Sequence, residues 1–277
     1  MMKKIAVLGA NGTVGQHIVP ALVAAGHTVF AASRSGKAVE GATSVAVDYD
    51  KPASFDALFK TVDVAYVMLP TGYVDIEAKL LPVIALAAEH GVKVVFQSVF
   101  GVDADDSIPY RKAELALEAS GTPYVILRPN WFMDNFHSFW LAGIQHGQLA
   151  LPAGDAQTSF IDARDIADSA VATLTTEQFD GKAFNLTGAE ALSYAQAIEL
   201  IRSAIDKPVT YTACSPAFFT EGLINAGVPA DYAHFLAAIF EPVAAGYTAA
   251  TTCDVLQLTG HQPRRLADYL ATNATRF

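Results

Sequence analysis

The feature that most constrains the fold is a set of three evenly spaced glycines near the N-terminus. The segment GANGTVG places Gly9, Gly12 and Gly15 three residues apart, after the apolar run 4–8 and at the start of the helical pattern 14–25. At such a strand-to-helix turn, one glycine permits a positive φ, one lets the backbone approach a pyrophosphate, and one lets the helix pack closely on the strand. The phosphates then lie at the helix N-terminus, where free N–H groups and the helix dipole favour anions. The spacing therefore predicts a dinucleotide-binding loop with contacts from Gly9, Asn11, Gly12, Thr13, Val14 and Gly15.

Strand and helix patterns alternate through the first two-thirds of the chain. Expected strands are 4–8, 28–32, 44–47, 62–69, 92–98 and 123–129; expected helices are 14–25, 55–60 with Ser54 as N-cap, 73–90 and 110–120. This alternation predicts an α/β fold, a Rossmann doubly wound parallel sheet with helices on both faces. Later come expected helices at 131–144, 165–174 and 193–205, strands at 183–187 and 208–212, and a mostly helical tail.

The chain shows no linker, so we expect a single unit over 1–277. Its core, 1–130, would bind the cofactor, and a smaller, mostly helical C-terminal lobe would be built mainly from 131–160 and 183–277. Hydrophobic residues make up 52% of the chain and charged residues only 17%, which favours a sizeable core over disorder.

Charge and cysteine content restrict the partners. The net charge of −10 argues against nucleic acid, because phosphate binding needs a surface rich in Lys and Arg. Cys214 and Cys253 have no metal-like spacing and no disulfide framework around them, which fits a cytoplasmic protein. No apolar stretch reaches the length of a membrane span or a signal peptide, so no membrane partner is expected. A small-molecule substrate is expected, and a homodimer is compatible with the sequence.

The end of the second expected strand bears on which dinucleotide binds. A fold that prefers NAD usually places an acidic residue there, whereas this chain has Ser33 and Arg34. A guanidinium pairs well with a 2′-phosphate, so we predict NADP(H); the alternative is a solvated turn arginine. Asp48, after the third strand, is a candidate contact to the adenine amino group or a turn residue. Further cofactor contacts are expected at later strand ends, from Leu69, Pro70 and Ser98.

A series of segments along the chain resembles one family. KIAVLGANGTVG, SVFGVD, KAELALEASGTPYVILRPNWFMDNF, FIDARDIADSAV and KAFNLTGAEALSYAQAIELI have the order and spacing of the NmrA-like proteins, which are atypical short-chain dehydrogenase/reductase relatives. Within that family the chain is most similar to bacterial NAD(P)H:quinone oxidoreductases and triphenylmethane-dye reductases, whose NAGVP-like segment is matched at 225–229. The resemblance implies a Rossmann domain, a smaller lobe and a substrate cleft. Some members of the family bind NADP without catalysis, as redox sensors or regulators.

The chain departs from the superfamily at its usual acid, a tyrosine four residues before a lysine. Alignment on SGTPYVILRP puts Asp106 at the tyrosine position and Tyr110 at the lysine position, so the pair is missing. A shift of two residues would bring Lys112 into register instead. Tyr110 could donate a proton, because its ordinary pKa is about 10, and Ser98 is a second candidate donor. The alternative for Tyr110 is a surface position on an amphipathic helix.

Aromatic residues follow the strand ends, and Phe100, Trp131 and Phe132 are expected to bind the substrate. An aromatic site suits a flat conjugated hydride acceptor such as a quinone, which needs orientation more than a strong acid. Phe136 and Trp140 are expected to pack the lobe instead. The favoured function is therefore an NADPH-dependent reductase of a quinone or similar compound. A non-catalytic NADP-binding regulator, or an enzyme for a sugar or isoflavonoid-like substrate, remains the alternative.

No metal site is expected. The histidines are scattered without the pairing of a zinc site, and Asp162 and Asp165 have simpler roles. Asp165 would cap the helix that it begins, and Asp162 would pair with Arg164 or tether the lobe.

Overall fold

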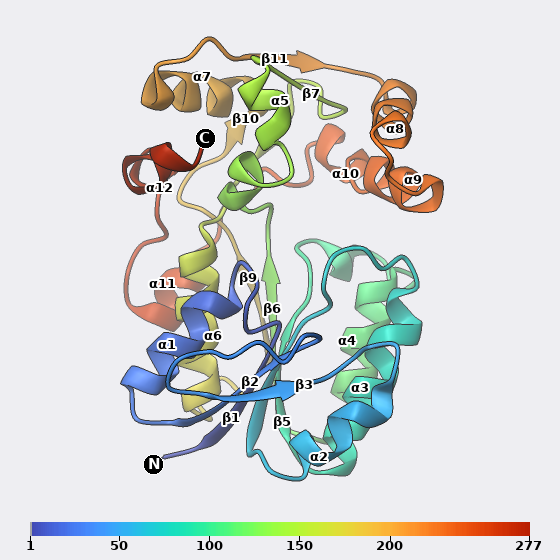
Figure 1. The fold of residues 1–277 in the computed structure, drawn as a ribbon, viewed down its shortest axis with the longest axis vertical. Helices are drawn as coiled ribbons and strands as arrows, with labels where there is room; N and C mark the ends of the chain where they lie inside the picture. Colours follow the sequence, from blue (N-terminus) through green and yellow to red (C-terminus); the bar gives the residue numbers. More distant parts are fainter. Residues whose placement is uncertain (1) are drawn as a thin grey trace. The chain divides into compact units, whose positions relative to one another are not determined.

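A parallel β-sheet forms the centre of the first part of the chain. The computed structural model describes residues 2–277, and in that range all pairs of neighbouring strands in this sheet are parallel. The seven strands run in the order β3 (Thr43–Ala46), β2 (Thr28–Ser33), β1 (Lys4–Leu8), β4 (Val64–Val67), β5 (Lys93–Gln97), β6 (Tyr124–Pro129) and β9 (Lys182–Leu186) (Figure 1). Strand order reverses between β1 and β4, which is the doubly wound arrangement of dinucleotide-binding folds. The predicted α/β Rossmann fold is confirmed.

Helices cover both faces of this sheet. On one face α1 (Gly15–Ala24) packs on α6 (Ala163–Thr175), and on the other α3 (Ile76–Glu89) packs on α4 (Pro109–Ala119) (Figure 1). The remaining segments here are η1 (Pro52–Phe55), α2 (Asp56–Phe59), η2 (Val102–Ala104) and α11 (Asp254–Thr259). No helix within residues 2–277 combines the length and the apolar character that crossing a bilayer requires.

Two compact units divide the chain. The first comprises 1–129, 163–186 and 254–261, and the second 130–162, 187–253 and 262–277. This division differs from the expected assignment of 183–277 to the lobe in two segments. β9 pairs with β6 along the sheet edge, and α11 packs on α6 and β9, so both belong with the sheet.

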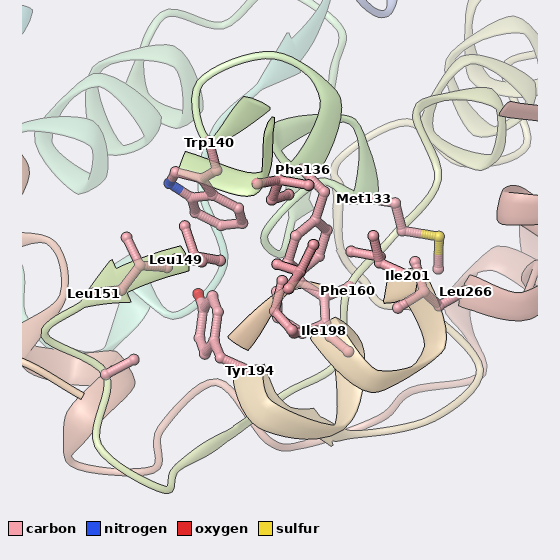
Figure 2. Packing of buried hydrophobic residues seen from close by; sticks show 14 of the residues in the cluster. Met133, Phe136, Trp140, Leu149, Leu151, Phe160, Tyr194, Ile198, Ile201 and Leu266 are labelled. Atoms are coloured by element: carbon pink, nitrogen blue, oxygen red, sulfur yellow. The ribbon is translucent and has the colours of Figure 1, made fainter. Parts of the chain in front are cut away.

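The second unit is built around an aromatic core. Its elements are η3 (Met133–His137), α5 (Leu141–Gln145), β7 (Gln148–Leu151), β8 (Gln157–Thr158), β10 (Leu192–Ser193), α7 (Tyr194–Ile205), β11 (Thr210–Ala213), α8 (Pro216–Asn225), α9 (Ala230–Ala238), α10 (Glu241–Ala244), α12 (Leu266–Asn273) and η4 (Ala274–Arg276). Phe136 contacts Trp140 and Phe160 edge to face, with ring centroids 4.9 and 5.1 Å apart, and Tyr194 lies in the same cluster (Figure 2). Phe136 and Trp140 therefore pack this unit, as expected.

Local capping differs from expectation at two helix starts. Ser54 does not cap α2; its hydroxyl accepts a hydrogen bond from Asp48 N at 2.9 Å and so stabilises the preceding turn. Asp165 does not cap α6, because the helix begins at Ala163 and places Asp165 inside its first turn. Ser193 does cap α7, in a capping box with Gln196, as its position at the start of the predicted helix indicated.

The expected helix 131–144 is interrupted. A 3-10 turn, η3, occupies 133–137 and the α-helix α5 only begins at Leu141. In a regular helix beginning at 131, Trp131 O would accept from Asn135 N; here Trp131 O accepts from Ile161 N at 2.9 Å, and Asn135 N donates to Phe132 O at 3.2 Å. Tertiary pairing thus overrides the apolar pattern of the segment.

Candidate functional site

The glycine turn joins β1 to α1 in a conformation that requires glycine at two positions. Gly9 has φ +70°, and a Cβ there would come within 2.7 Å of Met68 Sδ. At Gly15 a Cβ would lie 2.3 Å from Gly9 O and 2.8 Å from Ala10 Cα, so the first residue of α1 touches the end of β1. At Gly12 a Cβ would stand 3.1 Å from Gly9 O, a tight contact rather than an overlap. Gly9 and Gly15 are therefore required by the turn itself.

The N-terminus of α1 is open to an anion. No side chain caps the helix, and its first turn contains no acidic residue. Val14 occupies the N-cap position and is buried, whereas Asn11, Gly12 and Thr13 are exposed. A helix start leaves backbone N–H groups without intrahelical acceptors, so this end of α1 offers donors and a positive dipole end to a phosphate.

The loop is connected to the end of β2, where the residues predicted to set cofactor specificity lie. Ala10 N donates to Ala32 O at 3.2 Å, and Asn11 Nδ2 donates to Ser33 Oγ at 3.2 Å. Arg34 follows directly and is exposed. The structure thus brings Asn11 and Ser33 together, with Arg34 next in the chain, and contact of these residues with a cofactor stays a prediction.

Asp48 lies in a tight turn after β3. Its Oδ1 accepts a hydrogen bond from Asp50 N at 3.0 Å, while its backbone N–H donates to Ser54 Oγ at 2.9 Å. One carboxylate oxygen is therefore engaged in the turn. The contact to an adenine amino group stays a prediction.

Sequence reasoning missed Tyr49, which lies beside the end of β4. The Tyr49 hydroxyl donates to Met68 O, directly before Leu69 and Pro70. The Tyr49 ring packs against Phe55 at 5.2 Å and Tyr73 at 6.4 Å. Burial raises the pKa of Tyr49 far above its ordinary value, and the nearby Tyr110 adds to the shift. Alternation of polar and apolar residues gave no signal for this residue, because Tyr49 follows the third strand rather than lying within it.

A lysine connects the two loops at this edge. Lys79 on α3 binds Asp50 at 2.6 Å and Asp75 at 3.1 Å, and its ammonium lies 5.3 Å from the Tyr73 ring centroid. The hydrogen bond from Lys79 lowers the pKa of Asp50, and the positive charge of Arg34 lowers it further. Lys79 therefore holds the loop after β3 close to the loop after β4.

Ser98 stands out at the end of β5. Its side chain is buried, with 2% exposed, and its Oγ has no hydrogen-bond partner among residues 2–277. Its backbone N–H donates to Leu127 O at 2.8 Å, which continues the sheet ladder. A buried hydroxyl without a partner is costly, so Ser98 Oγ is a candidate hydrogen-bonding group for a ligand. Phe100, two residues on, is half-buried, and its N–H donates to Pro129 O at 3.1 Å.

Tyr110 and Lys112 lie near the start of α4 but face different neighbours. The Tyr110 ring is half-buried and stacks on Phe96 of β5, with centroids 6.4 Å apart. Lys112 is exposed and pairs with Glu77 of α3 at 2.9 Å. The structure therefore brings Tyr110, but not Lys112, toward the strands that carry Ser98 and Met68.

Trp131 and Phe132 belong to the second unit. The Trp131 ring is stacked on Trp140 at 5.9 Å and lies 4.7 Å from Phe240, while Phe132 forms a backbone bridge with Ile161. Both side chains are half-buried. Trp131 thus packs the core of its unit on at least one face, and contact of either residue with a substrate stays a prediction.

One group of potential metal ligands occurs among residues 2–277. Atoms of Asp165, Asp168 and His261 lie within 4.8 Å of one another, which the sequence spacing did not suggest. His261 Nε2 lies 3.2 Å from Asp168 Oδ2, so this pair links the segment after α11 to α6. Three such side chains are fewer than the four ligands of a closed zinc site, and the hydrogen-bonded pair accounts for their proximity.

Two relatives that match the chain over nearly its whole length are named as an oxidoreductase and an azoreductase. The chain is 32% identical to the uncharacterized oxidoreductase YesF of Bacillus subtilis, covering 99% of this chain and 97% of that one. It is 28% identical to the NAD(P)H azoreductase of Xenophilus azovorans, covering 99% of both chains.

Solved structures share the fold at lower identity. The NADPH-dependent quinone oxidoreductase of Escherichia coli in complex with NADPH superposes with a TM-score of 0.84 at 23% identity, covering 96% of this chain and 98% of that one. NmrA, a negative transcriptional regulator crystallised with NADP, superposes with a TM-score of 0.79 at 18% identity, covering 98% and 95%.

The family assignment rests on nearly the whole length of the chain. The NmrA-like family matches residues 1–270, which include the glycine turn, the sheet and most of the second unit. The segments that resembled this family in the sequence occupy the β1–α1 turn, the end of β5, α4 with β6, α6 and β9 with α7. The chain belongs to the NmrA-like family.

Proposed function

We propose that this chain is an NADPH-dependent reductase that transfers hydride to a quinone or a similar flat, conjugated small molecule. The observation that carries the proposal is the presence of unpaired donors at one edge of the sheet. The N-terminus of α1 has no side-chain cap, and the buried Ser98 hydroxyl has no partner among the described residues. Both lie at the carboxyl ends of parallel strands, where dinucleotides bind in doubly wound sheets.

The residues of this edge fit a dinucleotide. Glycine at Gly9, Gly12 and Gly15 keeps side chains away from the turn, so the N–H groups of Asn11, Thr13 and Val14 are available to the pyrophosphate. Arg34 would bind the 2′-phosphate of NADPH beside Ser33, and Asp48 would face the adenine. Leu69, Pro70 and Ser98 would contact the nicotinamide half.

In this reaction the protein has to orient the acceptor relative to the nicotinamide and to supply one proton. When bound, the reduced nicotinamide supplies the hydride. We assign to the Tyr110 hydroxyl the role of proton donor to the oxygen of the reduced acceptor. The Tyr110 ring stacks on Phe96, which limits its motion. Phe100 offers an aromatic surface close in sequence to Ser98, and Trp131 and Phe132 are further candidates for contact with the acceptor. Hydride transfer between flat rings depends mainly on their relative orientation, so a strong acid is not needed.

The test is the oxidation of NADPH by the purified chain in the presence of benzoquinone, an enone and a triarylmethane dye, followed by NADPH absorbance. Turnover with at least one acceptor, faster with NADPH than with NADH, is the expected result. Tight NADPH binding with no turnover on any acceptor would contradict the reductase proposal and favour a regulator.

Tyr110→Phe tests the proton donor. It should lower kcat with benzoquinone by on the order of a hundredfold while NADPH affinity stays the same. Tyr247→Phe is the matched control, because Tyr247 is 75% exposed in the second unit. Full turnover in Tyr110→Phe would show that another group donates the proton.

A further inference from the structure

One residue of α4, a turn after Tyr110, has a carboxylate that is fully buried. Glu114 is 0% exposed and accepts two hydrogen bonds from Arg128, Nε to Oε1 at 2.9 Å and Nη2 to Oε2 at 2.7 Å. Arg111 Nη1 donates to the same Oε2 at 2.9 Å. We call Arg111, Glu114 and Arg128 the arginine cluster. Its geometry is a bidentate fork from one strand and a single bond from one helix, meeting on one buried carboxylate.

The same two arginines also bind the loop that connects β5 to α4. Arg128 Nη1 donates to Asp103 Oδ2 at 2.5 Å, and Arg111 Nε donates to Asp106 Oδ1 at 3.1 Å. Partial burial acts to lower the pKa of Arg111, but its hydrogen bonds to Glu114, Glu118 and Asp106 outweigh burial and raise that pKa. Two positions of the loop, Asp103 and Asp106, are therefore each connected to Glu114 through one arginine.

The elements joined in this way carry the proposed reacting groups. Ser98 lies at the start of the connection and its N–H pairs with Leu127, the neighbour of Arg128. Phe100 and Asp103 follow in the same connection, and Tyr110 is the second residue of α4, which begins at Pro109. Tyr110 and Glu114 are four residues apart, so their side chains lie on the same face of the helix. Because Glu114 is bound to Arg128 of β6, the rotation of α4 about its axis is restricted. This rotation sets the direction of the Tyr110 side chain.

We infer that the arginine cluster positions the Tyr110 hydroxyl: Glu114 is a positioning residue that sets the rotation of α4 and the path of the 99–108 loop through Arg128 and Arg111. The inference rests on the proposed reductase function for its kinetic readout. It assigns to Glu114 and Arg128 no contact with the cofactor or the acceptor.

The presence of a buried ion pair between Arg128 and Glu114, rather than apolar side chains, supports a positioning role over simple packing. Burying an ion pair costs desolvation free energy, and apolar residues of similar volume often stabilise a fold as well or better. A forked guanidinium–carboxylate pair, in contrast, restricts both distance and angle, which an apolar contact does not. In the Arg128–Glu114 pair both Glu114 oxygens are bound, so the carboxylate has a single orientation.

Arg128→Lys is the sharpest variant, because it keeps the charge and removes the fork. If the cluster only balances charge, Arg128→Lys should retain kcat. If it positions Tyr110, kcat with benzoquinone should fall by on the order of tenfold or more, with Kd for NADPH unchanged within about twofold, since small misplacements of reacting groups cost large rate factors. Arg111→Met, at the partly exposed side of the cluster, should give a smaller loss of the same kind. Arg202→Met is the control, because Arg202 forms an exposed ion pair with Glu199 on α7.

All kinetic assays are run at a temperature at which circular dichroism shows that the variants are folded, so that a loss of kcat does not reflect unfolding. Unchanged kcat in both Arg128→Lys and Arg111→Met would overturn the inference, as would an equal loss of NADPH affinity, which would indicate general disruption.

A second readout does not depend on turnover. Fluorotyrosine placed at position 110 should show a changed ¹⁹F chemical shift and a broader line in Arg128→Lys but not in Arg202→Met. If the wild-type chain reduces no acceptor, the proposed function fails, and the ¹⁹F comparison still decides whether the cluster orients Tyr110. Identical ¹⁹F spectra in wild type and Arg128→Lys would overturn the inference in either case.

Discussion

Gly15 is in direct contact with Gly9: a Cβ on Gly15 would lie 2.3 Å from Gly9 O. This overlap exists without any ligand, because it arises from the way α1 starts against the end of β1. Gly12 differs, since its Cβ would meet Gly9 O at 3.1 Å and little else. The third glycine of the motif is therefore explained by helix–strand packing, and Gly12 is the position at which we predict close approach to a phosphate.

Gly15→Ala should destabilise the chain by about 2 kcal/mol or more, because the methyl group forces α1 away from β1. Chemical denaturation measures the change, and NADPH affinity should fall with it. Gly222→Ala is the matched control: Gly222 is an exposed residue of α8, and a Cβ added there would meet no other atom within 4 Å. It should raise stability by up to about 1 kcal/mol, as expected for Ala in an exposed helix. Equal stability of Gly15→Ala and wild type would contradict the packing argument.

Arg34→Ala should change which dinucleotide binds. Loss of charged hydrogen bonds to a 2′-phosphate costs about 1.5–3 kcal/mol, so NADPH affinity should fall by roughly ten- to a hundredfold while NADH affinity stays constant. Isothermal titration with both dinucleotides measures the effect. Arg202→Ala, on α7 of the second unit, should change neither affinity. Tighter binding of NADH than NADPH by the wild-type chain, unaltered in Arg34→Ala, would rule out the assigned role.

The sheet could be predicted from the sequence because its signals are local. The strand 4–8 coincides with β1, and the helix 193–205, with Ser193 at its start, differs from α7 only in that Ser193 is the cap. Local apolar runs and capping residues specify these elements without reference to the rest of the chain.

The missed features depend on partners distant in sequence. β8 and β10 have two residues each and exist only because Thr158 pairs with Leu192. Glu114 would be taken for a surface residue of an amphipathic helix, whereas in the structure hydrogen bonds from Arg128 of β6 and from Arg111 compensate for the burial of its charge. Ser98 was predicted from a strand end and Tyr110 from its position relative to the SGTPYVILRP segment, but the unpaired Ser98 hydroxyl required the structure.

Lys93→Met should destabilise the first unit. Lys93 is 6% exposed at the start of β5, and its Nζ donates to Thr173 O at 2.9 Å and Thr176 O at 2.6 Å beside an ion pair with Asp180. Removing the ammonium leaves carbonyls at the end of α6 and a carboxylate without their partner, which should cost about 2–4 kcal/mol in unfolding free energy.

Lys60→Met is the control for Lys93→Met. Lys60 pairs with Asp56 on the surface with 59% of its side chain exposed, and its loss should cost no more than about 0.5 kcal/mol. Denaturant unfolding of both variants gives the comparison. A cost for Lys93→Met as small as that for Lys60→Met would mean that the buried contacts of Lys93 add nothing.

His137 should make the second unit less stable in mild acid. Burial, with a further contribution from Arg276, lowers the pKa of His137 to about 4, and its Nδ1 lies 2.5 Å from the Tyr269 hydroxyl. The unfolded chain has the ordinary histidine pKa of about 6.5, so between these values the unfolded state binds more protons than the folded state. Stability is therefore fully present above about pH 6.5 and is lost as the pH falls toward 4. Because the ring is partly open to solvent, we expect a loss of about 1–2 kcal/mol.

The measurement is the unfolding free energy at pH 7 and pH 5 for wild type and His137→Gln. Glutamine keeps a hydrogen-bonding group near Tyr269 but does not titrate, so the variant should lose less stability than wild type over this interval. His234→Gln is the matched control, because His234 is an exposed histidine of α9, and its pH dependence should follow wild type. A direct check is the NMR titration of the His137 imidazole, which should stay neutral down to pH 5. Protonation of His137 with a midpoint near 6.5, or an equal pH dependence in wild type and His137→Gln, would show that its burial does not disfavour the charged ring.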